Sequence, residues 1–294
     1  MDTVGKWIAS YLKQREIDTL FTLTGGHIFP LLDGCIDADV RVVDTRHEQA
    51  AAFAAEGWAL RTGRPGAYVV TAGPGFLNAV SGLAHASVTL SPTLCFTGAS
   101  PIADDDKGAP QELEQLRVAE VYTRYAKTVR RTDRIPQYME AAFQHMLGPT
   151  PGPAFLEIPT DVLYKPLSAD APVGFGPRPT PRSAGDPRDI ERAAAMLREA
   201  ERPTVVVGGG AFWSGAASAL ADFAEQTALP IPPLLSPRKP FEAVASPLVA
   251  ALSASRRRSP PARRRGICRS TRSRLIWDRG RTATTHAHGR PQIR

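Results

Sequence analysis

The sequence contains few cysteines, a single asparagine and no long apolar run, and these shortages exclude several classes of protein. Cys35, Cys95 and Cys268 lie far apart and form no CxxC pair, which is typical of a reducing compartment and not of a disulfide-rich secreted domain. No apolar stretch approaches the ~20 residues that a membrane-spanning helix needs. The amino terminus also lacks the basic-then-apolar order of a signal peptide. We therefore predict a cytoplasmic protein with no membrane partner.

The basic net charge comes from one end of the chain. The 294 residues are 43% apolar and 22% charged, an ordinary balance for a globular protein of about two domains, and the formal net charge is +7. Residues 256–294 hold 13 arginines and one acid, Asp278, whereas residues 1–255 hold 23 basic and 28 acidic residues. The body of the protein is thus mildly acidic, and its charge does not indicate a nucleic-acid-binding protein.

Strand and helix patterns alternate in short units over the first half of the chain. Expected strands lie at residues 19–23, 41–44, 67–71, 92–97 and 154–158, and expected helices at 4–15, 28–35, 47–62, from about 77, near 113–120 and at 135–147. This alternation predicts an α/β domain with a mostly parallel sheet.

The second half of the chain changes character twice. Six prolines between residues 166 and 187 predict an extended linker. A second α/β pattern then follows, with a helix at 188–200, a strand at 204–207, a glycine turn at 208–210, a helix at 214–227 and a further short strand near 229–231. From residue 236, serine, proline and arginine dominate and cannot form a core. We predict a first domain at 1–165, a linker at 166–187, a partial Rossmann-like middle domain at 188–235 and a disordered basic tail at 236–294.

One carboxylate stands between two glycine turns, each of which follows an expected strand. Glu48 opens a helix after the second strand, Gly25-Gly26 follows the first strand, and residues 71–75 follow the third. An acid at a helix start can simply complement the helix dipole, and glycine turns can serve conformation alone. The carboxyl ends of parallel strands meet at one edge of a sheet, where α/β folds bind ligands. Their joint placement therefore favours a ligand site around Glu48.

Five segments carry a family resemblance. They are FTLTGGH at residues 21–27, DTRHE at 44–48, AAEGWA at 54–59, TAGPG at 71–75 and PGPAFLEIPTDVLY at 151–164. With this combination, residues 1–165 resemble the N-terminal, pyrimidine-binding domain of thiamine-diphosphate enzymes. The resemblance is strongest to the acetolactate synthase group, and within it to the 2-hydroxyacyl-CoA lyase-like branch. Residues 188–232 resemble the beginning of the family's middle domain.

The resemblance implies roles for single residues. Glu48, the predicted catalytic residue, matches the glutamate that hydrogen-bonds N1′ of the cofactor's aminopyrimidine and favours the tautomer that takes the thiazolium C2 proton. His27 and Gln111 match substrate-side positions. Pro110 replaces the aromatic residue that usually precedes Gln111 in the family. For His27, a hydrogen bond within the loop is an equally good explanation. The predicted cofactor-binding residues are Gly25, Gly26, Gly73, Pro74, Gly75 and Asn78.

The chain departs from the family in its second half. Family members bind Mg²⁺ and the cofactor's diphosphate in a third domain marked by Gly-Asp-Gly and, about thirty residues later, paired asparagines. This sequence has no Gly-Asp-Gly, and Asn78 is its one asparagine, so no metal ligand is predicted in it. The middle domain binds FAD in the acetolactate synthase group and ADP in acyl-CoA relatives, and the sequence leaves both open. The arginine-rich tail has the composition of a GC-rich coding region read in the wrong frame, which predicts a truncated or frameshifted product.

These features predict the half of an enzyme that activates the pyrimidine of thiamine diphosphate. The expected reaction joins or cleaves carbon–carbon bonds of 2-keto acids, as in acetolactate synthases, with cleavage of 2-hydroxyacyl-CoA as the alternative. The resemblance implies a homodimer or homotetramer, and the chain alone is expected to show no turnover. A different class of function is a non-catalytic fragment whose tail binds nucleic acid or another anionic partner. The tail contains only one aromatic residue, Trp277, which argues against nucleic acid.

Overall fold

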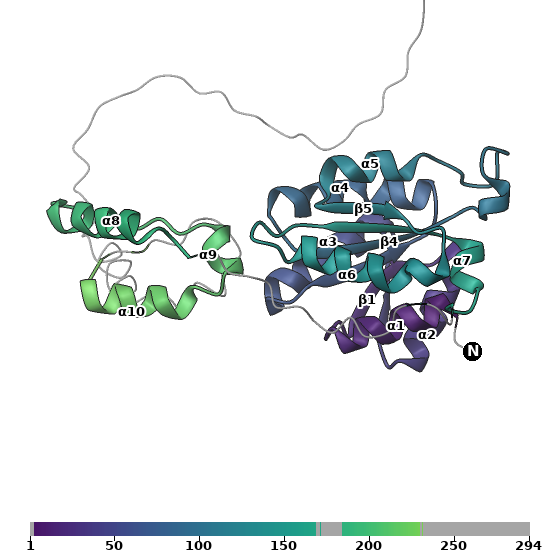
Figure 1. Cartoon of the computed structure of the whole chain (residues 1–294), viewed down its shortest axis with the longest axis horizontal. Helices are drawn as coiled ribbons and strands as arrows, with labels where there is room; N and C mark the ends of the chain where they lie inside the picture. The colour runs from purple at the N-terminus through teal and green to yellow at the C-terminus, as the bar shows by residue number, and fades with distance from the viewer. Residues whose placement is uncertain (1–2, 169–170, 172–183, 230, 232–294) are drawn as a thin grey trace, which may run out of the picture. The chain divides into compact units, whose positions relative to one another are not determined.

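The computed structural model describes residues 3–168, 171, 184–229 and 231 (Figure 1). Apart from Ala171 and Ile231, these residues fall into two parts, residues 3–168 and residues 184–229. Most of the linker predicted at 166–187 and all of the tail predicted at 236–294 lie outside the described residues. Within the described ranges, no helix combines the length and the apolar character that a membrane span requires.

The first part is built on a six-stranded sheet in which every neighbouring pair of strands is parallel. The strand order is β2-β1-β3-β4-β6-β5. The strands are β1 (Thr19–Leu23), β2 (Arg41–Asp44), β3 (Gly66–Val70), β4 (Thr93–Ala99), β5 (Tyr125–Thr128) and β6 (Ala154–Pro159). The predicted fold class, α/β with a parallel sheet, is confirmed.

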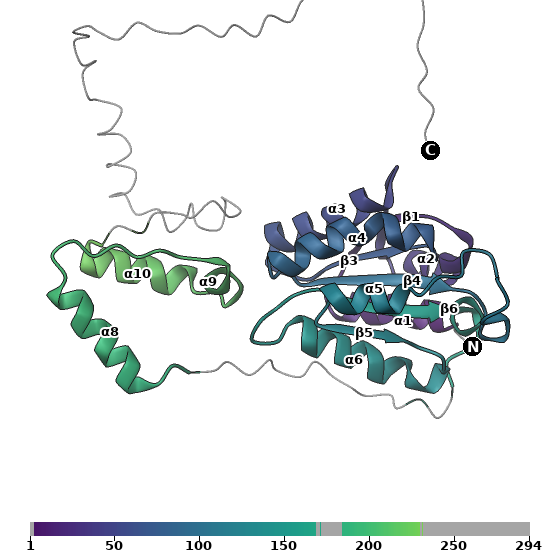
Figure 2. The same ribbon diagram turned by 90° about the horizontal axis from the view of Figure 1, so that it is seen from above.

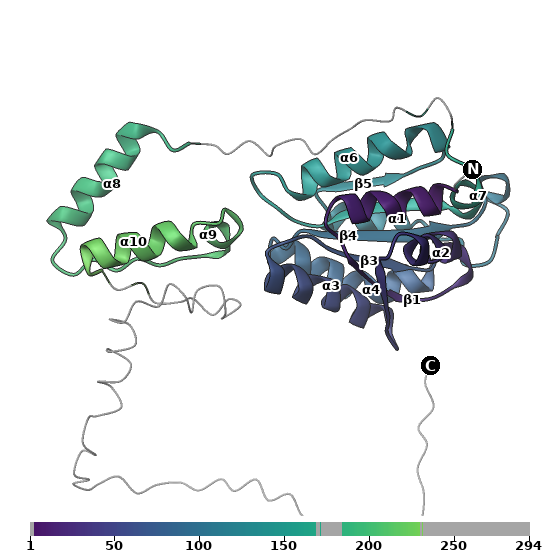
Figure 3. The ribbon, with the colours of Figure 1, turned by 90° about the horizontal axis from the view of Figure 1, so that it is seen from below.

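Helices cover both faces of this sheet (Figure 2; Figure 3). One layer contains α1 (Val4–Gln14), α2 (Phe29–Asp37) and α6 (Ile135–Met146), and the other contains α3 (Glu48–Thr62), α4 (Pro74–Val88) and α5 (Gln115–Tyr122). The central strands alternate between these two cores. On β3, Ala67 and Val69 face the first layer, while Tyr68 and Val70 face the second. Burial on both faces explains why these strands read as continuous apolar runs.

Several elements differ from the sequence-based expectation. Strand β5 and helix α7 (Thr160–Tyr164) were not predicted, and α4 begins at Pro74 instead of near residue 77. Proline fits there because the first turn of a helix does not need its backbone N–H. Strand β5 escaped prediction because it is a short strand at the end of the sheet order, with only partial burial.

The part at residues 184–229 consists of α8 (Pro187–Glu199), α9 (Gly209–Trp213) and α10 (Ala217–Thr227). The strand predicted at 204–207 is wrong, since only an isolated bridge at Val207 forms, and the expected glycine turn instead leads directly into α9. The strand expected near 229–231 does not form at residues 229 or 231. A strand needs at least one neighbouring strand to satisfy its backbone groups, and the described residues of this part contain none.

Two glycines of the first part give a matched test of this packing. A methyl group at Gly66, the first residue of β3, would collide with the backbone carbonyl of Ala55 in α3, whereas one at Gly57 in α3 would meet no atom within 4 Å. We expect Gly66→Ala to lower the free energy of unfolding by about 1–3 kcal/mol. Gly57→Ala should raise it by up to about 1 kcal/mol, because alanine favours the helix. Urea unfolding of both variants measures the difference, and equal effects would contradict the close approach of α3 to β3.

Candidate functional site

Three loops meet at the carboxyl edge of the sheet because the strands that precede them are adjacent and in register. Thr22 of β1 is paired with Asp44 of β2 on one side and with Val69 of β3 on the other. The loops after these strands therefore emerge side by side, as the sequence predicts for parallel strands. Thr45 reinforces the junction, since its backbone N–H and its hydroxyl both donate to the carbonyl oxygen of Thr22, at 2.7 and 3.0 Å.

Glu48 lies at the first turn of α3 and is only 7% exposed. The amide Nδ2 of Asn78, on α4, donates a 3.0 Å hydrogen bond to Glu48 Oε2. No hydrogen bond to Glu48 Oε1 is found among the described residues. The helix itself is capped by His47, whose Nδ1 accepts from the backbone N–H of Gln49, so Glu48 is not used for capping. The carboxylate is thus buried, oriented by one amide and free to accept a hydrogen bond at its other oxygen.

Thr71, at the end of β3, is the point where the two glycine turns touch. A Cβ at Gly25 would lie 2.5 Å from Thr71 Cβ, and one at Gly75 would lie 2.6 Å from Thr71 Cγ2. The Cβ position of Gly75 is also 3.5 Å from Glu48 Oε1. Any side chain at Gly75 would therefore crowd both Thr71 and the catalytic candidate, whereas glycine leaves the approach to Glu48 open.

His27 packs against this same threonine. Its Nδ1 lies 3.0 Å from Thr71 Oγ1, and burial lowers the pKa of the imidazole, which favours the neutral ring. The loop hydrogen bond considered for His27 is present. Gly26 differs from its neighbour Gly25, because a Cβ there would meet no atom within 4 Å. The structure therefore gives Gly26 no packing reason to be glycine, and its role in cofactor binding stays a prediction.

The turn at residues 71–75 is held from its other side by the loop that carries Gln111. Gly73 has φ +61° and ψ −113°, and a Cβ there would collide with the carbonyl oxygen of Gln111. Gln111 itself has φ +65°. Pro74 opens α4 and is exposed. The structure thus brings Gln111 next to Gly73, and the contact runs through its backbone.

A cleft of about 710 Å³ opens beside Gln111. It is lined by Ser100 at the end of β4, by the loop at residues 105–116, and by Thr128, Arg130 and Glu157. Arg130 forms an ion pair with Asp105 across this cleft. Gln111 lines this polar cleft, which fits a substrate-side position.

A buried polar network under the turn contains two residues that were not predicted as site residues, Gln115 and Glu157. The side-chain amide of Gln115 is hydrogen-bonded to the backbone of Gly73 and to the carboxylate of Glu157, at 2.9 and 2.8 Å. A signal for Gln115 exists in the sequence. It occupies the position on α5 where helical periodicity with Ala119 predicts an apolar residue. Glu157 carries the same kind of signal, because it is the one charged residue of an otherwise apolar strand, but its partners are distant in sequence and no local pattern identifies them.

A second polar tie joins α3 to α4 further from the site. Glu56 is 2% exposed and accepts hydrogen bonds from Thr89 and Ser91, at 2.6 and 3.3 Å, while one of its oxygens lies 2.7 Å from His85 Nδ1. His85 therefore has a structural partner in Glu56.

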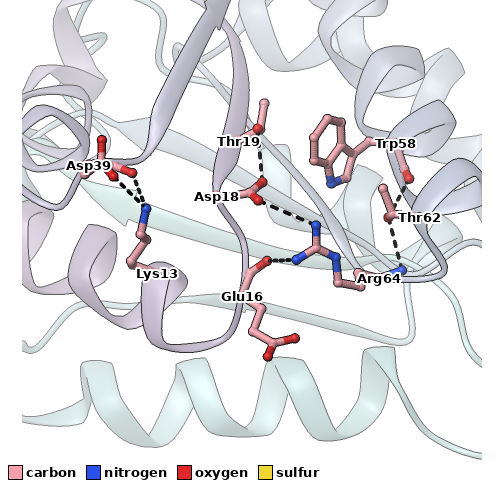
Figure 4. A network of polar contacts seen from close by, with 8 residues as sticks. All are labelled: Lys13, Glu16, Asp18, Thr19, Asp39, Trp58, Thr62 and Arg64. Carbon is pink, nitrogen blue, oxygen red and sulfur yellow. Dashed lines mark hydrogen bonds and ion pairs between the residues drawn. The ribbon is translucent and has the colours of Figure 1, made fainter.

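Polar residues at the opposite, amino edge of the sheet pair with one another (Figure 4). Lys13 forms an ion pair with Asp39 at 3.1 Å, and Arg64 pairs with Asp18 at 3.5 Å and donates to the carbonyl oxygen of Glu16 at 3.1 Å. Thr19 donates to Asp18 at 3.1 Å. These contacts connect the loops that precede β1, β2 and β3. We assign them a structural role, because both cations already have carboxylate partners.

The carboxyl edge has the features that an aminopyrimidine requires. A planar ring with a hydrogen-bonding nitrogen could approach Glu48 Oε1 across Gly75, because neither a side chain nor a competing hydrogen bond occupies that position among the described residues. In the described ranges, no group of three His, Cys, Asp or Glu side chains is placed to hold a metal ion. The residues at this edge thus fit the pyrimidine half of thiamine diphosphate.

Comparison with known families agrees with this geometry. A profile described as "Thiamine pyrophosphate enzyme, N-terminal TPP binding domain" matches residues 2–118, which include β1 to β4 and every predicted site residue. A second profile, "Thiamine pyrophosphate enzyme, central domain", matches residues 190–245.

Individual relatives carry two kinds of name. The acetolactate synthase large subunit IlvG of Mycobacterium tuberculosis is 37% identical over 230 residues, which is 77% of this chain and 42% of the relative. The probable acetolactate synthase large subunit of Methanocaldococcus jannaschii is 34% identical over 233 residues, covering 76% of this chain and 39% of the relative. The 2-hydroxyacyl-CoA lyase 2 of Homo sapiens is 33% identical over 240 residues, covering 70% and 38%. The chain spans about two fifths of the length of these relatives.

The fold, the buried glutamate at the carboxyl edge and both profile matches lead to one assignment. The parallel sheet places Glu48 beside the two glycine turns, and the N-terminal profile covers that whole region. The central-domain profile covers most of α8 and all of α9 and α10. This chain belongs to the family of thiamine-pyrophosphate enzymes.

Proposed function

We propose that the chain supplies the pyrimidine-activating half of a thiamine-diphosphate-dependent enzyme that forms or cleaves carbon–carbon bonds of 2-keto acids. The observation that carries this proposal is the buried Glu48 carboxylate, with Oε2 held by Asn78 and Oε1 open beside Gly75. Relatives named acetolactate synthase support 2-keto acids as substrates. Relatives named 2-hydroxyacyl-CoA lyase 2 make a 2-hydroxyacyl-CoA the second candidate substrate.

In this proposal, each site residue of the chain has a defined role toward the bound cofactor or substrate. Thiamine diphosphate, when bound, supplies the carbanion-stabilising chemistry that such reactions need. Glu48 holds or takes a proton at the ring nitrogen N1′ through Oε1, while Asn78 fixes the plane of the carboxylate through Oε2. Burial excludes water from Glu48 and makes this proton transfer depend on the bound ring. Gly25 and Gly75 keep side chains away from the ring, and Gln111 and His27 face the substrate side.

We place the remaining cofactor contacts elsewhere in the enzyme. The sequence has no Gly-Asp-Gly motif and one asparagine, so Mg²⁺ and the diphosphate are assigned to the family's third domain. FAD and ADP both stay candidate ligands of the central domain, because the profile that matches residues 190–245 names neither.

A second copy of the chain is the expected partner of the α3–α4 layer. Phe53 of α3 and Leu77 of α4 are 39% and 46% exposed, and α4 contains no Asp, Glu, Lys or Arg. Exposed apolar side chains beside a helix without charged residues are typical of a surface that another protein covers. This supports the homodimer or homotetramer that the family resemblance implies, with the site completed by another subunit.

A chimeric enzyme tests the proposal. Residues 1–165 of this chain would replace the corresponding domain of the Mycobacterium tuberculosis acetolactate synthase relative and, separately, of the human 2-hydroxyacyl-CoA lyase 2 relative. We expect cofactor-dependent turnover in at least one host, with pyruvate in the first or a 2-hydroxyacyl-CoA in the second. The unmodified 294-residue chain should show no turnover with either substrate. Two folded chimeras that bind the cofactor but turn over neither substrate would contradict the proposal.

A further inference from the structure

The side chain of Gln115 makes four hydrogen bonds in the buried network under the site. It is 2% exposed, and both ends of its amide are fully occupied. Its Oε1 accepts from the backbone N–H of Gly73 at 2.9 Å and lies 3.2 Å from the Thr97 hydroxyl. Its Nε2 donates to the carbonyl oxygen of Gly98 at 3.0 Å and to Glu157 Oε2 at 2.8 Å. One side chain therefore connects the turn after β3 to the ends of β4 and β6.

The bond to Gly73 holds a backbone conformation that has little other support. Gly73 has φ +61° and ψ −113° and is buried, so its N–H needs a partner inside the protein. Gln115 supplies that partner, while the carbonyl of Gln111 packs against the other side of the glycine. Loss of the Gln115 amide would leave a buried donor unsatisfied at the turn that positions Gly75 beside Glu48.

We propose that Gln115 is a positioning residue that holds the turn at residues 71–75 in its ligand-binding conformation, and that its hold depends on the ionised state of Glu157. This inference rests on the proposed function only in taking the turn at residues 71–75 to bind a ligand. The hydrogen-bond network itself is present in the chain without one.

Glu157 can couple this network to pH. Burial raises the pKa of its carboxyl group, while hydrogen bonds from Thr128 and Gln115 and the charge of Arg130 act in the opposite direction. Glu114, on the Gln115 side, raises it further, and Arg130 is itself paired with Asp105. The ionised carboxylate accepts from Gln115 at Oε2 and from Thr128 at Oε1. A proton on either oxygen adds a donor there and makes that oxygen a weaker acceptor, so the bond from Gln115 or the bond from Thr128 is weakened.

The experiment reads the amide of Gly73 in the full 294-residue chain labelled with ¹⁵N-glycine. Gln115→Met keeps the length of the side chain but removes its donors and acceptor. We expect the Gly73 amide to exchange with solvent roughly 10-fold faster, the size expected for one lost hydrogen bond. Gln144→Met is the matched control, because Gln144 is an exposed residue of α6 that bonds only Glu140, at 3.3 Å. Exchange at Gly73 should not change in this control.

A pH titration separates positioning from simple space filling. In the wild-type chain, the Gly73 amide shift should move as Glu157 titrates, at a pH above the usual range of a glutamate. Glu157→Gln should abolish that transition, whereas a transition caused by other carboxylates of the cleft would persist. The double variant Gln115→Glu, Glu157→Gln reverses the direction of their hydrogen bond and keeps an acceptor for Gly73, and it gives up only the bond from residue 115 to the carbonyl oxygen of Gly98. It should restore slow exchange even if Gln115→Met fails to fold.

Two results would overturn the inference. One is a Gly73 amide whose exchange is the same in folded Gln115→Met as in the wild type. The other is a Gly73 shift with no titration linked to Glu157. Neither readout needs cofactor or turnover, so a failure here is distinguishable from a failure of the proposed enzymatic function.

Discussion

Glu48→Gln is expected to reduce the turnover of an active chimera by about 10²–10⁴-fold, the usual contribution of a positioned acid–base group. Glutamine keeps the shape of the side chain, and its carbonyl oxygen can still accept the hydrogen bond that Asn78 gives to Glu48 Oε2. It cannot take up or release a proton at N1′. The variant should therefore fold and unfold like the wild type while kcat falls. Steady-state kinetics at saturating cofactor, together with thermal unfolding, measure both quantities.

Glu120→Gln is the matched control for this substitution. Glu120 is an exposed residue of α5, so the same chemical change there should leave kcat within experimental error. A loss of less than 10-fold in Glu48→Gln, or an equal loss in both variants, would show that Glu48 only complements the start of α3. That outcome would support the simpler interpretation of an acid at a helix amino terminus.

Phe155→Ala is expected to cause the largest loss of stability, about 3–5 kcal/mol, because it removes a fully buried aromatic ring. Phe155 lies on β6 and is 0% exposed, and its ring centroid is 4.8 Å from that of Phe76 on α4. The substitution would leave a cavity between the sheet and the α3–α4–α5 layer. Urea unfolding should give a lower midpoint with an unchanged slope, as expected when the native contacts are weakened and the unfolded surface is the same.

The control for Phe155 is the same substitution at a surface position. Phe29, at the start of α2, is 50% exposed, so Phe29→Ala should cost less than half as much as Phe155→Ala. Comparable losses in the two variants would contradict the packing of the second core. A large loss for Phe29→Ala alone would instead indicate that its exposed half is covered by another molecule.

Much of the first domain could be predicted from local pattern. The apolar runs at β1, β3, β4 and β6 are buried on both faces, and such runs identify central parallel strands. Edge strand β5 and the pattern at residues 204–207 show the limit of this reasoning. Strand β5 is short, and it forms because β6 lies beside it. The equally short apolar run at 204–207 has no neighbouring strand in the described residues.

The sequence by itself determined the family and the alternation of strands and helices. It also determined that Glu48 and the two glycine turns belong to one edge, because adjacent parallel strands end together and the motifs follow those strands directly. The tertiary structure decided what holds these groups. Thr71 between Gly25 and Gly75, and Gln115 between Gly73 and Glu157, are contacts between residues as many as 46 positions apart in the chain. Local periodicity carries no information on such pairs, since only the packing of distant segments brings their polar atoms within hydrogen-bond distance.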